Sequence, residues 1–180
     1  MSSLRARSLD AAIDLLATQG LKALTHRRID ERADLPPGST SNYFRTRDAL
    51  LLGVADAILE REVSGMRATF APRSAEELLD ALVALLDRTT EDQRTLTSAR
   101  LVLFMEASHN PALRERFDRG RTILEAALQR ALRELGARDA VASTRAVMAC
   151  AEGLILHRVA RYDDSDIRPI LELVVRAALA

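Results

Sequence analysis

The chain is poor in aromatic residues and nearly free of cysteine. Tryptophan is absent, aromatic residues make up 3% of the 180 residues, and Cys150 is the one cysteine. A single cysteine excludes an intramolecular disulfide and is typical of a reducing compartment. Because Cys150 lies on an apolar helix face, we expect it to be an inert core residue.

Glycine and proline are also scarce, at 7 and 5 residues, and they cluster at breaks between apolar segments. Hydrophobic residues make up 48% of the chain, so a sizeable core can form. This profile is typical of an all-α protein. No uncharged apolar run of about 18 residues occurs, and the N-terminus lacks a signal-like segment. We therefore expect a cytoplasmic protein without a membrane partner.

The chain lacks the patterns that enzymes and metal proteins show. Its histidines, His26, His109 and His157, are far apart and have no partners at metal-ligand spacing. No Ser-His-Asp signature, glycine-rich phosphate loop or nucleophile elbow is present. We expect no metal, no cofactor and no enzymatic activity. An all-α enzyme would instead need a polar catalytic cluster in a pocket.

Charge is balanced overall but not along the chain. The formal net charge is zero; residues 1–50 carry 8 Lys/Arg and 6 Asp/Glu, whereas the other 130 carry 18 and 20. The N-terminal part thus has a slight basic excess of +2, which favours nucleic-acid binding there.

Apolar spacing predicts about nine helices. Gly20 is expected to end the first helix, and Ser74 with Glu77 forms a capping box before the fifth. The sixth is apolar on most sides, so we expect it to be central. The nine predicted ranges are 4–18, 25–33, 37–44, 48–70, 75–88, 96–108, 111–135, 139–161 and 167–179.

The stretch from Thr25 to Leu51 predicts a helix-turn-helix. A short helical pattern is followed by a turn at Asp34, a residue that tolerates left-handed geometry. Pro36 and Pro37 then suit a helix start. The second helix opens with small polar side chains, and Asp48 stands in an N-cap-like position before the next one. This layout is typical of DNA-reading proteins.

These residues resemble the helix-turn-helix of the tetracycline-repressor (TetR) family of bacterial transcriptional regulators. The residues that match the family pattern are Thr25, Ile29, Ala33, Gly38, Phe44, Arg47, Leu50 and Leu51. The departures are Asp34, Pro36, Ser39 and Ser41. The resemblance implies a three-helix head over residues 1–48 and a larger helical effector-binding and dimerisation domain over residues 49–180.

The resemblance also implies how the head meets DNA. Arg27 would contact a guanine, for which an arginine is well shaped. The positions that would face the major groove are Pro37, Gly38, Ser41 and Asn42. Those that would touch phosphates are Thr25, His26, Ser39, Tyr43, Arg45 and Arg47. The charged residues Asp30, Glu31 and Arg32 are expected to form surface ion pairs worth about 0–1 kcal/mol.

Met and Phe side chains make adaptable apolar walls, so they are candidates for an effector pocket. The candidates for a small apolar or amphipathic ligand are Met66, Phe70, Leu101, Phe104, Met105, Phe117 and Met148. Polar anchors could come from Glu106, His109 and Glu152. Ordinary core packing is the alternative for each of them.

The two C-terminal helices carry broad apolar stripes. By the resemblance, they would pair with those of a second copy in a four-helix bundle. The candidate dimer residues are Val147, Leu154, Ile155, Ile167, Ile170, Leu171, Val174 and Val175.

The sequence predicts a homodimeric regulator that reads a pseudo-palindromic DNA operator. It would be a repressor released by a small molecule, whose binding within residues 60–160 shifts the helix at 48–70. The alternatives are a helical adaptor that binds protein and a regulator without an effector.

Overall fold

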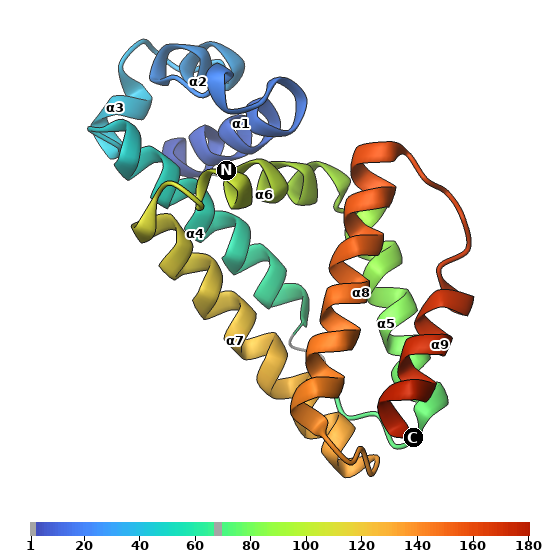
Figure 1. Cartoon of the computed structure of the whole chain (residues 1–180). Helices are drawn as coiled ribbons and strands as arrows, with labels where there is room; N and C mark the ends of the chain where they lie inside the picture. Colours follow the sequence, from blue (N-terminus) through green and yellow to red (C-terminus); the bar gives the residue numbers. More distant parts are fainter. Residues whose placement is uncertain (1–2, 67–69) are drawn as a thin grey trace. The chain divides into compact units, whose positions relative to one another are not determined.

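The computed structural model describes residues 3–66 and 70–180, with the backbone alone for residues 63–66. Its described residues form nine α-helices and a short 3-10 helix, and no strand, which confirms the predicted all-α class (Figure 1). The elements in chain order are α1 (Leu4–Gln19), η1 (Leu21–Ala23), α2 (His26–Arg32), α3 (Ser39–Tyr43), α4 (Arg47–Met66), α5 (Ala75–Thr90), α6 (Arg94–Glu106), α7 (Pro111–Glu134), α8 (Ala140–Arg161) and α9 (Arg168–Leu179). Within the described residues, no helix has the length and apolarity needed to cross a membrane.

Local sequence signals account for most helix ends. The hydroxyl of Ser74 accepts a hydrogen bond from the Glu77 backbone N–H at 3.1 Å, so the predicted N-cap of α5 is present. Thr25 caps α2 in the same way. Gly20 ends α1 with a φ of 73°, and Asp34 adopts the left-handed turn with a φ of 50°. Both turn predictions are confirmed.

The starts of α3 and α4 differ from the prediction. α3 begins at Ser39 rather than at Pro37, because Gly38 is left-handed with a φ of 89° and breaks the helical path before it. α4 is capped by the Thr46 hydroxyl, which accepts from the Ala49 backbone N–H at 3.1 Å. Asp48 instead lies in the first turn of α4, where a negative charge suits the helix dipole.

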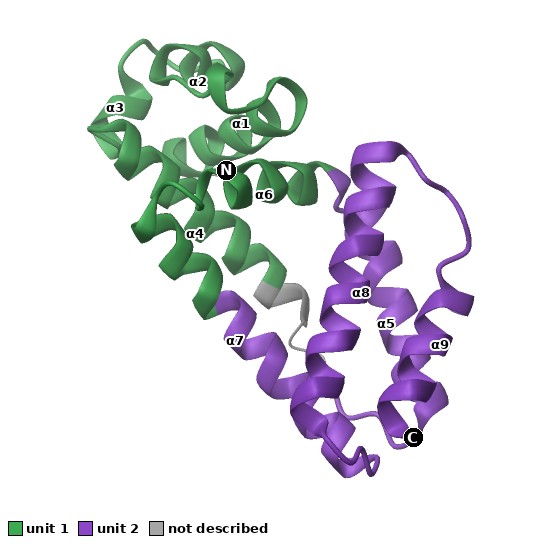
Figure 2. Ribbon diagram, in the orientation of Figure 1, with its two compact units in different colours: residues 1–64, 95–119 green, residues 65–94, 120–180 purple. Residues whose placement is uncertain are grey.

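The chain folds as two compact units, coloured green and purple in Figure 2. Unit 1 comprises residues 1–64 and 95–119, and unit 2 comprises residues 65–94 and 120–180. Both units are assembled from separate stretches of the chain, and α7 contributes to each. The domain boundary between residues 48 and 49 stays a prediction.

Unit 1 has a core of aliphatic side chains around the first helices. Leu16 and Leu24 are fully buried, and α6 and α7 add Leu103 and Leu113. A Glu62–Arg100 ion pair joins α4 to α6 at 3.0 Å.

The apolar sequence of α6 predicted a central, buried helix. For unit 1 this prediction is wrong. Only Thr97, Ala99 and Leu103 of its residues are buried. Phe104 and Met105 are 52% and 70% exposed. The apolar run covers more than one face of the helix. Only part of it is buried in the unit 1 core.

Unit 2 packs α5 against α8 and α9. Leu78, Leu82 and Leu86 recur every fourth residue along α5, which is the spacing of one helix face, and all three are buried. Cys150 is part of the packing around this core, and burial raises the pKa of its thiol. A raised pKa keeps the thiol protonated and unreactive, as expected for an inert cysteine.

Candidate nucleic-acid interface

Asp30 joins the two helices of the helix-turn-helix. Its Oδ2 accepts from the Gly38 backbone N–H at 2.8 Å, and its Oδ1 accepts from the backbone N–H of Thr40 at 2.8 Å and from the Thr40 hydroxyl at 2.5 Å. Asp30 is only 4% exposed, so the expectation of a surface ion pair is wrong for this residue. Hydrogen bonds to a charged group contribute about 1.5–3 kcal/mol each, which offsets the cost of burying the carboxylate.

Three basic side chains hold the ends of the head's helices. The Nε2 atom of His26 lies 2.5 Å from the carbonyl oxygen of Phe44, which follows α3. Arg47 donates to the carbonyl oxygen of Leu24 at 2.9 Å, and Arg7 donates to that of Ala33 at 2.6 Å. These bonds satisfy backbone acceptors that the short helices leave unpaired. His26 and Arg47 therefore have structural roles besides the proposed phosphate contacts.

The exposed side of α3 carries the predicted groove-facing residues. Asn42 and Tyr43 are exposed on the helix, and Pro37 and Gly38 are exposed just before it. Arg45 is exposed two residues after α3 and forms no ion pair with any residue that the structure describes. Amide, phenol and guanidinium groups are thus free on one short stretch, where they can bond to base edges and phosphates.

The two serines of α3 are less available than their predicted roles require. The Ser39 residue is buried, and its hydroxyl donates to the Pro36 carbonyl oxygen at 2.6 Å. The Ser41 hydroxyl donates to the Gly38 carbonyl oxygen at 2.8 Å. Both hydroxyl hydrogens are bonded within the turn that precedes α3. Only the oxygen lone pairs of the two serines remain available to a partner.

Of the remaining charges in α2, Glu31 and Arg32 form the expected surface pairs. Arg27, whose side chain is 83% exposed, pairs with Glu31 one turn later at 3.0 Å. Arg32 pairs with Asp14 of α1 at 2.6 Å. Exposed pairs of this kind contribute about 0–1 kcal/mol, so Arg27 can leave Glu31 for a DNA contact at little cost.

The sequence-predicted ligand residues do not come together in one unit. Leu101, Phe104, Met105 and Phe117 belong to unit 1, where Phe104 and Phe117 stack edge to face with centroids 6.0 Å apart. Phe70 and Met148 pack in unit 2. The side chain of Met66 lies outside the described residues.

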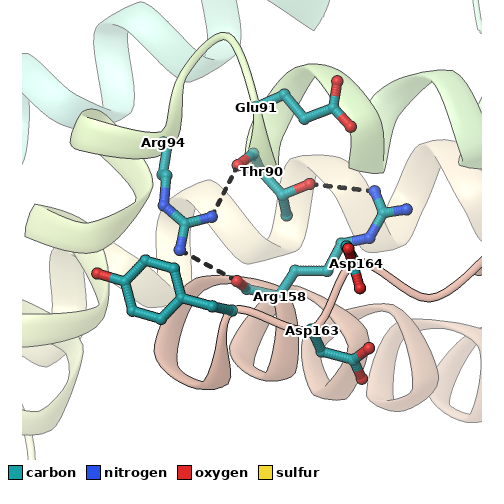
Figure 3. A pocket seen from close by; sticks show the side chains of 7 residues that line it. Thr90, Glu91, Arg94, Arg158, Asp163 and Asp164 are labelled. Atoms are coloured by element: carbon teal, nitrogen blue, oxygen red, sulfur yellow. Dashed lines mark hydrogen bonds between the residues drawn. The ribbon is translucent and has the colours of Figure 1, made fainter.

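A pocket of about 260 Å³ lies within unit 2 and contains none of those residues (Figure 3). Its lining is polar: Thr90, Glu91, Arg94, Arg158, Tyr162, Asp163 and Asp164.

Contacts within the protein already occupy both arginines of this pocket. Arg94 donates to the Val159 carbonyl oxygen at 2.9 Å and lies over the Tyr162 ring at 4.6 Å. Arg158 donates to Asp87 at 2.6 Å. The pocket therefore presents carboxylates rather than free positive charge.

Half of the candidate dimer residues are core residues of unit 2. Val147, Ile167, Leu171 and Val175 are at most 2% exposed, because they face α5 inside unit 2, and assigning them to an outer dimer face is wrong. Leu154, Ile155 and Val174 are partly buried there. Ile170 is 42% exposed.

Two exposed leucines of α8 and α9 were not among the residues predicted from the sequence. Leu156 of α8 is 48% exposed and Leu173 of α9 is 72% exposed. Leu173 follows Ile170 at a spacing that places both on one helix face. The apolar surface of α8 and α9 thus consists partly of other residues than predicted.

Two family models match the chain. The model described as "Bacterial regulatory proteins, tetR family" matches residues 9–54. The model described as "Tetracyclin repressor-like, C-terminal domain" matches residues 73–180, which is more than half of the chain.

Among curated proteins, the HTH-type transcriptional repressor KstR of Mycolicibacterium smegmatis is 31% identical over 107 residues, covering 58% of this chain and 52% of that protein. The curated relatives are matched over 34% to 57% of their own length.

Solved structures match over nearly the full length. A TetR-family member from Streptomyces coelicolor A3 is 26% identical with a TM-score of 0.79, covering 99% of each chain. The multidrug binding protein EbrR complexed with ethidium is 25% identical with a TM-score of 0.77, again covering 99% of each chain.

Proposed function

The chain belongs to the TetR family of bacterial transcriptional regulators, and on this basis we propose that it represses transcription by binding a pseudo-palindromic DNA operator as a homodimer. α3 enters the major groove, with Asn42 and Tyr43 toward the DNA. The observation that carries this proposal is that α3 is held from behind while its exposed side is polar and flanked by Arg45.

The division of labour within the head follows from these contacts. Asn42 offers an amide, which bonds well to the N6 and N7 atoms of adenine. Arg45 and the N–H groups near the start of α2 supply phosphate contacts that hold the helix in register. Arg27 contributes a guanidinium for guanine after it leaves Glu31. Thr25 and Tyr43 complete the phosphate-facing edge.

Dimerisation through α8 and α9 accounts for their exposed apolar side chains. Leu156 of α8 and Ile170 and Leu173 of α9 are exposed apolar side chains that a second copy can cover. A two-fold dimer presents two copies of α3 to half-sites separated by a helical turn or a multiple of it.

We also propose that a small apolar or amphipathic effector releases the protein from DNA. EbrR, which shares the fold over the whole chain, was crystallised with ethidium. An effector acts only if it binds the DNA-competent and released conformations with different affinity.

Selection from a random pool of duplex DNA tests DNA recognition. The expected result is enrichment of an inverted repeat, protected in a footprint on both half-sites. Recovery of a random set of sequences would contradict sequence-specific recognition.

A thermal-shift screen with apolar and amphipathic compounds tests the effector. Ethidium is screened by thermal shift in the absence of DNA, because it also binds DNA. The expected hit raises the unfolding temperature and weakens binding to the selected duplex. Stabilising compounds that leave DNA affinity unchanged would favour the alternative, a regulator without an effector.

A further inference from the structure

Helix α3 has no side chain of its own to cap its N-terminus. Its N-cap residue is Gly38, which is left-handed with a φ of 89° and carries no acceptor. A helix of five residues is unstable alone, because its few hydrogen bonds do not offset the ordering of its backbone. The position of α3 therefore depends on groups outside it.

The carboxylate of Asp30 in α2 supplies the missing cap. One oxygen accepts from Gly38 N–H and the other from both the backbone N–H and the hydroxyl of Thr40. Because both oxygens are bonded in different directions, the carboxylate resists rotation of α3 about its axis. Its negative charge also interacts favourably with the positive end of the helix.

We propose that Asp30 is a positioning residue for DNA recognition, which sets the orientation of α3 from inside the head without touching DNA. The proposal rests on the proposed function, that α3 reads DNA. Asp30 is 4% exposed and Thr40 is 0% exposed, so neither side chain reaches a base. Asn42 and Tyr43 lie two and three residues after Thr40 in the same helix, so a rotation of Thr40 displaces both. Base contacts tolerate little displacement because their donor and acceptor patterns must align.

A positioning role and a purely structural role have different consequences. Loss of stability alone lowers the concentration of folded protein, and it weakens binding to every DNA sequence alike. A misaligned α3 weakens binding to the operator but leaves phosphate contacts with other DNA. The ratio of specific to non-specific affinity in fully folded protein distinguishes the two roles.

Two pairs of variants of the full chain provide the test. Asp30→Asn keeps the shape of the side chain but turns an amide NH₂ toward one of the N–H donors. Asp34→Asn is the matched control, because it removes the same charge from an exposed turn position whose left-handed backbone also suits asparagine. Thr40→Val removes the hydroxyl, whereas Thr40→Ser retains it.

Affinities for the selected duplex and for a scrambled duplex are measured well below the unfolding temperature of each variant. The specific-to-non-specific ratio should fall about tenfold or more in Asp30→Asn and Thr40→Val. It should stay within about twofold of wild type in Asp34→Asn and Thr40→Ser. Loss of a negative charge strengthens binding to any duplex, so a fall in operator affinity cannot arise from charge.

Hydrogen exchange of the Gly38 and Thr40 amides, measured without DNA, gives a second readout. Exchange at both should be faster in Asp30→Asn than in Asp34→Asn. Unchanged exchange, or an unchanged affinity ratio in folded Asp30→Asn, would overturn the positioning role while leaving the proposed function intact. If Asp30→Asn does not fold, the Thr40 pair decides by the same ratio. A wild-type protein without any sequence preference would overturn the proposed function, and this role with it.

Discussion

The aromatic ring of Phe44 packs directly against the backbone of Gly53. A Cβ at Gly53 would stand 2.3 Å from Cε1 of Phe44, far inside van der Waals contact. Phe44 is buried and closes the C-terminal end of α3, while Gly53 lies within α4. The absence of a side chain at Gly53 thus allows α4 to pack closely against the end of α3.

Gly53→Ala should destabilise the protein although alanine favours helices. The gain in helix propensity of about 1 kcal/mol is outweighed by an overpacking cost of about 1–3 kcal/mol, because the buried ring has little room to move. Chemical unfolding should show a net loss of up to about 2 kcal/mol. The control is Gly153→Ala in α8, where nothing lies within 4 Å of the added methyl. Equal effects at the two positions would contradict the packing argument.

Arg45→Ala should weaken binding to all DNA sequences and reduce its dependence on salt. Each phosphate contact releases counterions and the proposed dimer carries two copies of Arg45, so the slope of log affinity against log salt should decrease by about 1.8 in magnitude. Arg138→Ala is the matched control, because Arg138 is also an exposed arginine but belongs to unit 2. Fluorescence anisotropy across a salt series measures both slopes. An unchanged slope for Arg45→Ala would remove this residue from the interface.

The sequence was sufficient to predict the fold because its signals are local. Helix ends follow from caps such as Ser74 and breaks such as Gly20, and the face of α5 follows from leucines at fixed spacing. These features depend on residues close together in the chain, where periodicity and capping chemistry act.

The internal support of α3 could not be predicted in the same way. Asp30 belongs to a short helix in which most residues are charged, so its pattern is that of a solvated helix surface. Its partners Gly38 and Thr40 lie beyond a turn, and only the geometry of that turn brings their N–H groups to the carboxylate. The exposure of Phe104 and Met105 was missed for a related reason, because an apolar run does not reveal how much of it a core can accept.

Glu62 should make stability depend on pH. Burial raises the pKa of this carboxyl above its usual 4.5, and the neighbouring Arg100 opposes the shift only in part. A raised pKa in the folded state means that the contribution of Glu62 is fully present below pH 4.5 and is lost as the pH rises through the folded-state pKa.

Glu62→Gln should therefore remove a decline in unfolding free energy above pH 4.5. Urea unfolding at a series of pH values measures the difference, with the exposed Glu60→Gln of the same helix as control. The slopes of unfolding free energy against pH are compared rather than the absolute values, since Glu62→Gln also breaks the ion pair with Arg100. Parallel profiles for wild type and Glu62→Gln would rule out this contribution.

Leu173→Asp should convert the proposed homodimer to monomers. Leu173 is 72% exposed on α9, beside Ile170, so the change leaves the core of unit 2 intact while placing a charge on the proposed dimer surface. Ile123→Asp, at an exposed position of α7, is the control. Sedimentation velocity should show a smaller species for Leu173→Asp alone. A dimer that survives this change would place the interface elsewhere.

The central claim, that the exposed side of α3 reads DNA, is tested most directly by the affinity of an Asn42→Ala, Tyr43→Ala double variant for the selected duplex. Both side chains are exposed, so the variant should remain folded and dimeric. We predict that its affinity falls to that of wild type for a scrambled duplex. A double variant that binds the selected duplex as tightly as wild type would contradict the assignment of α3 as the reading helix.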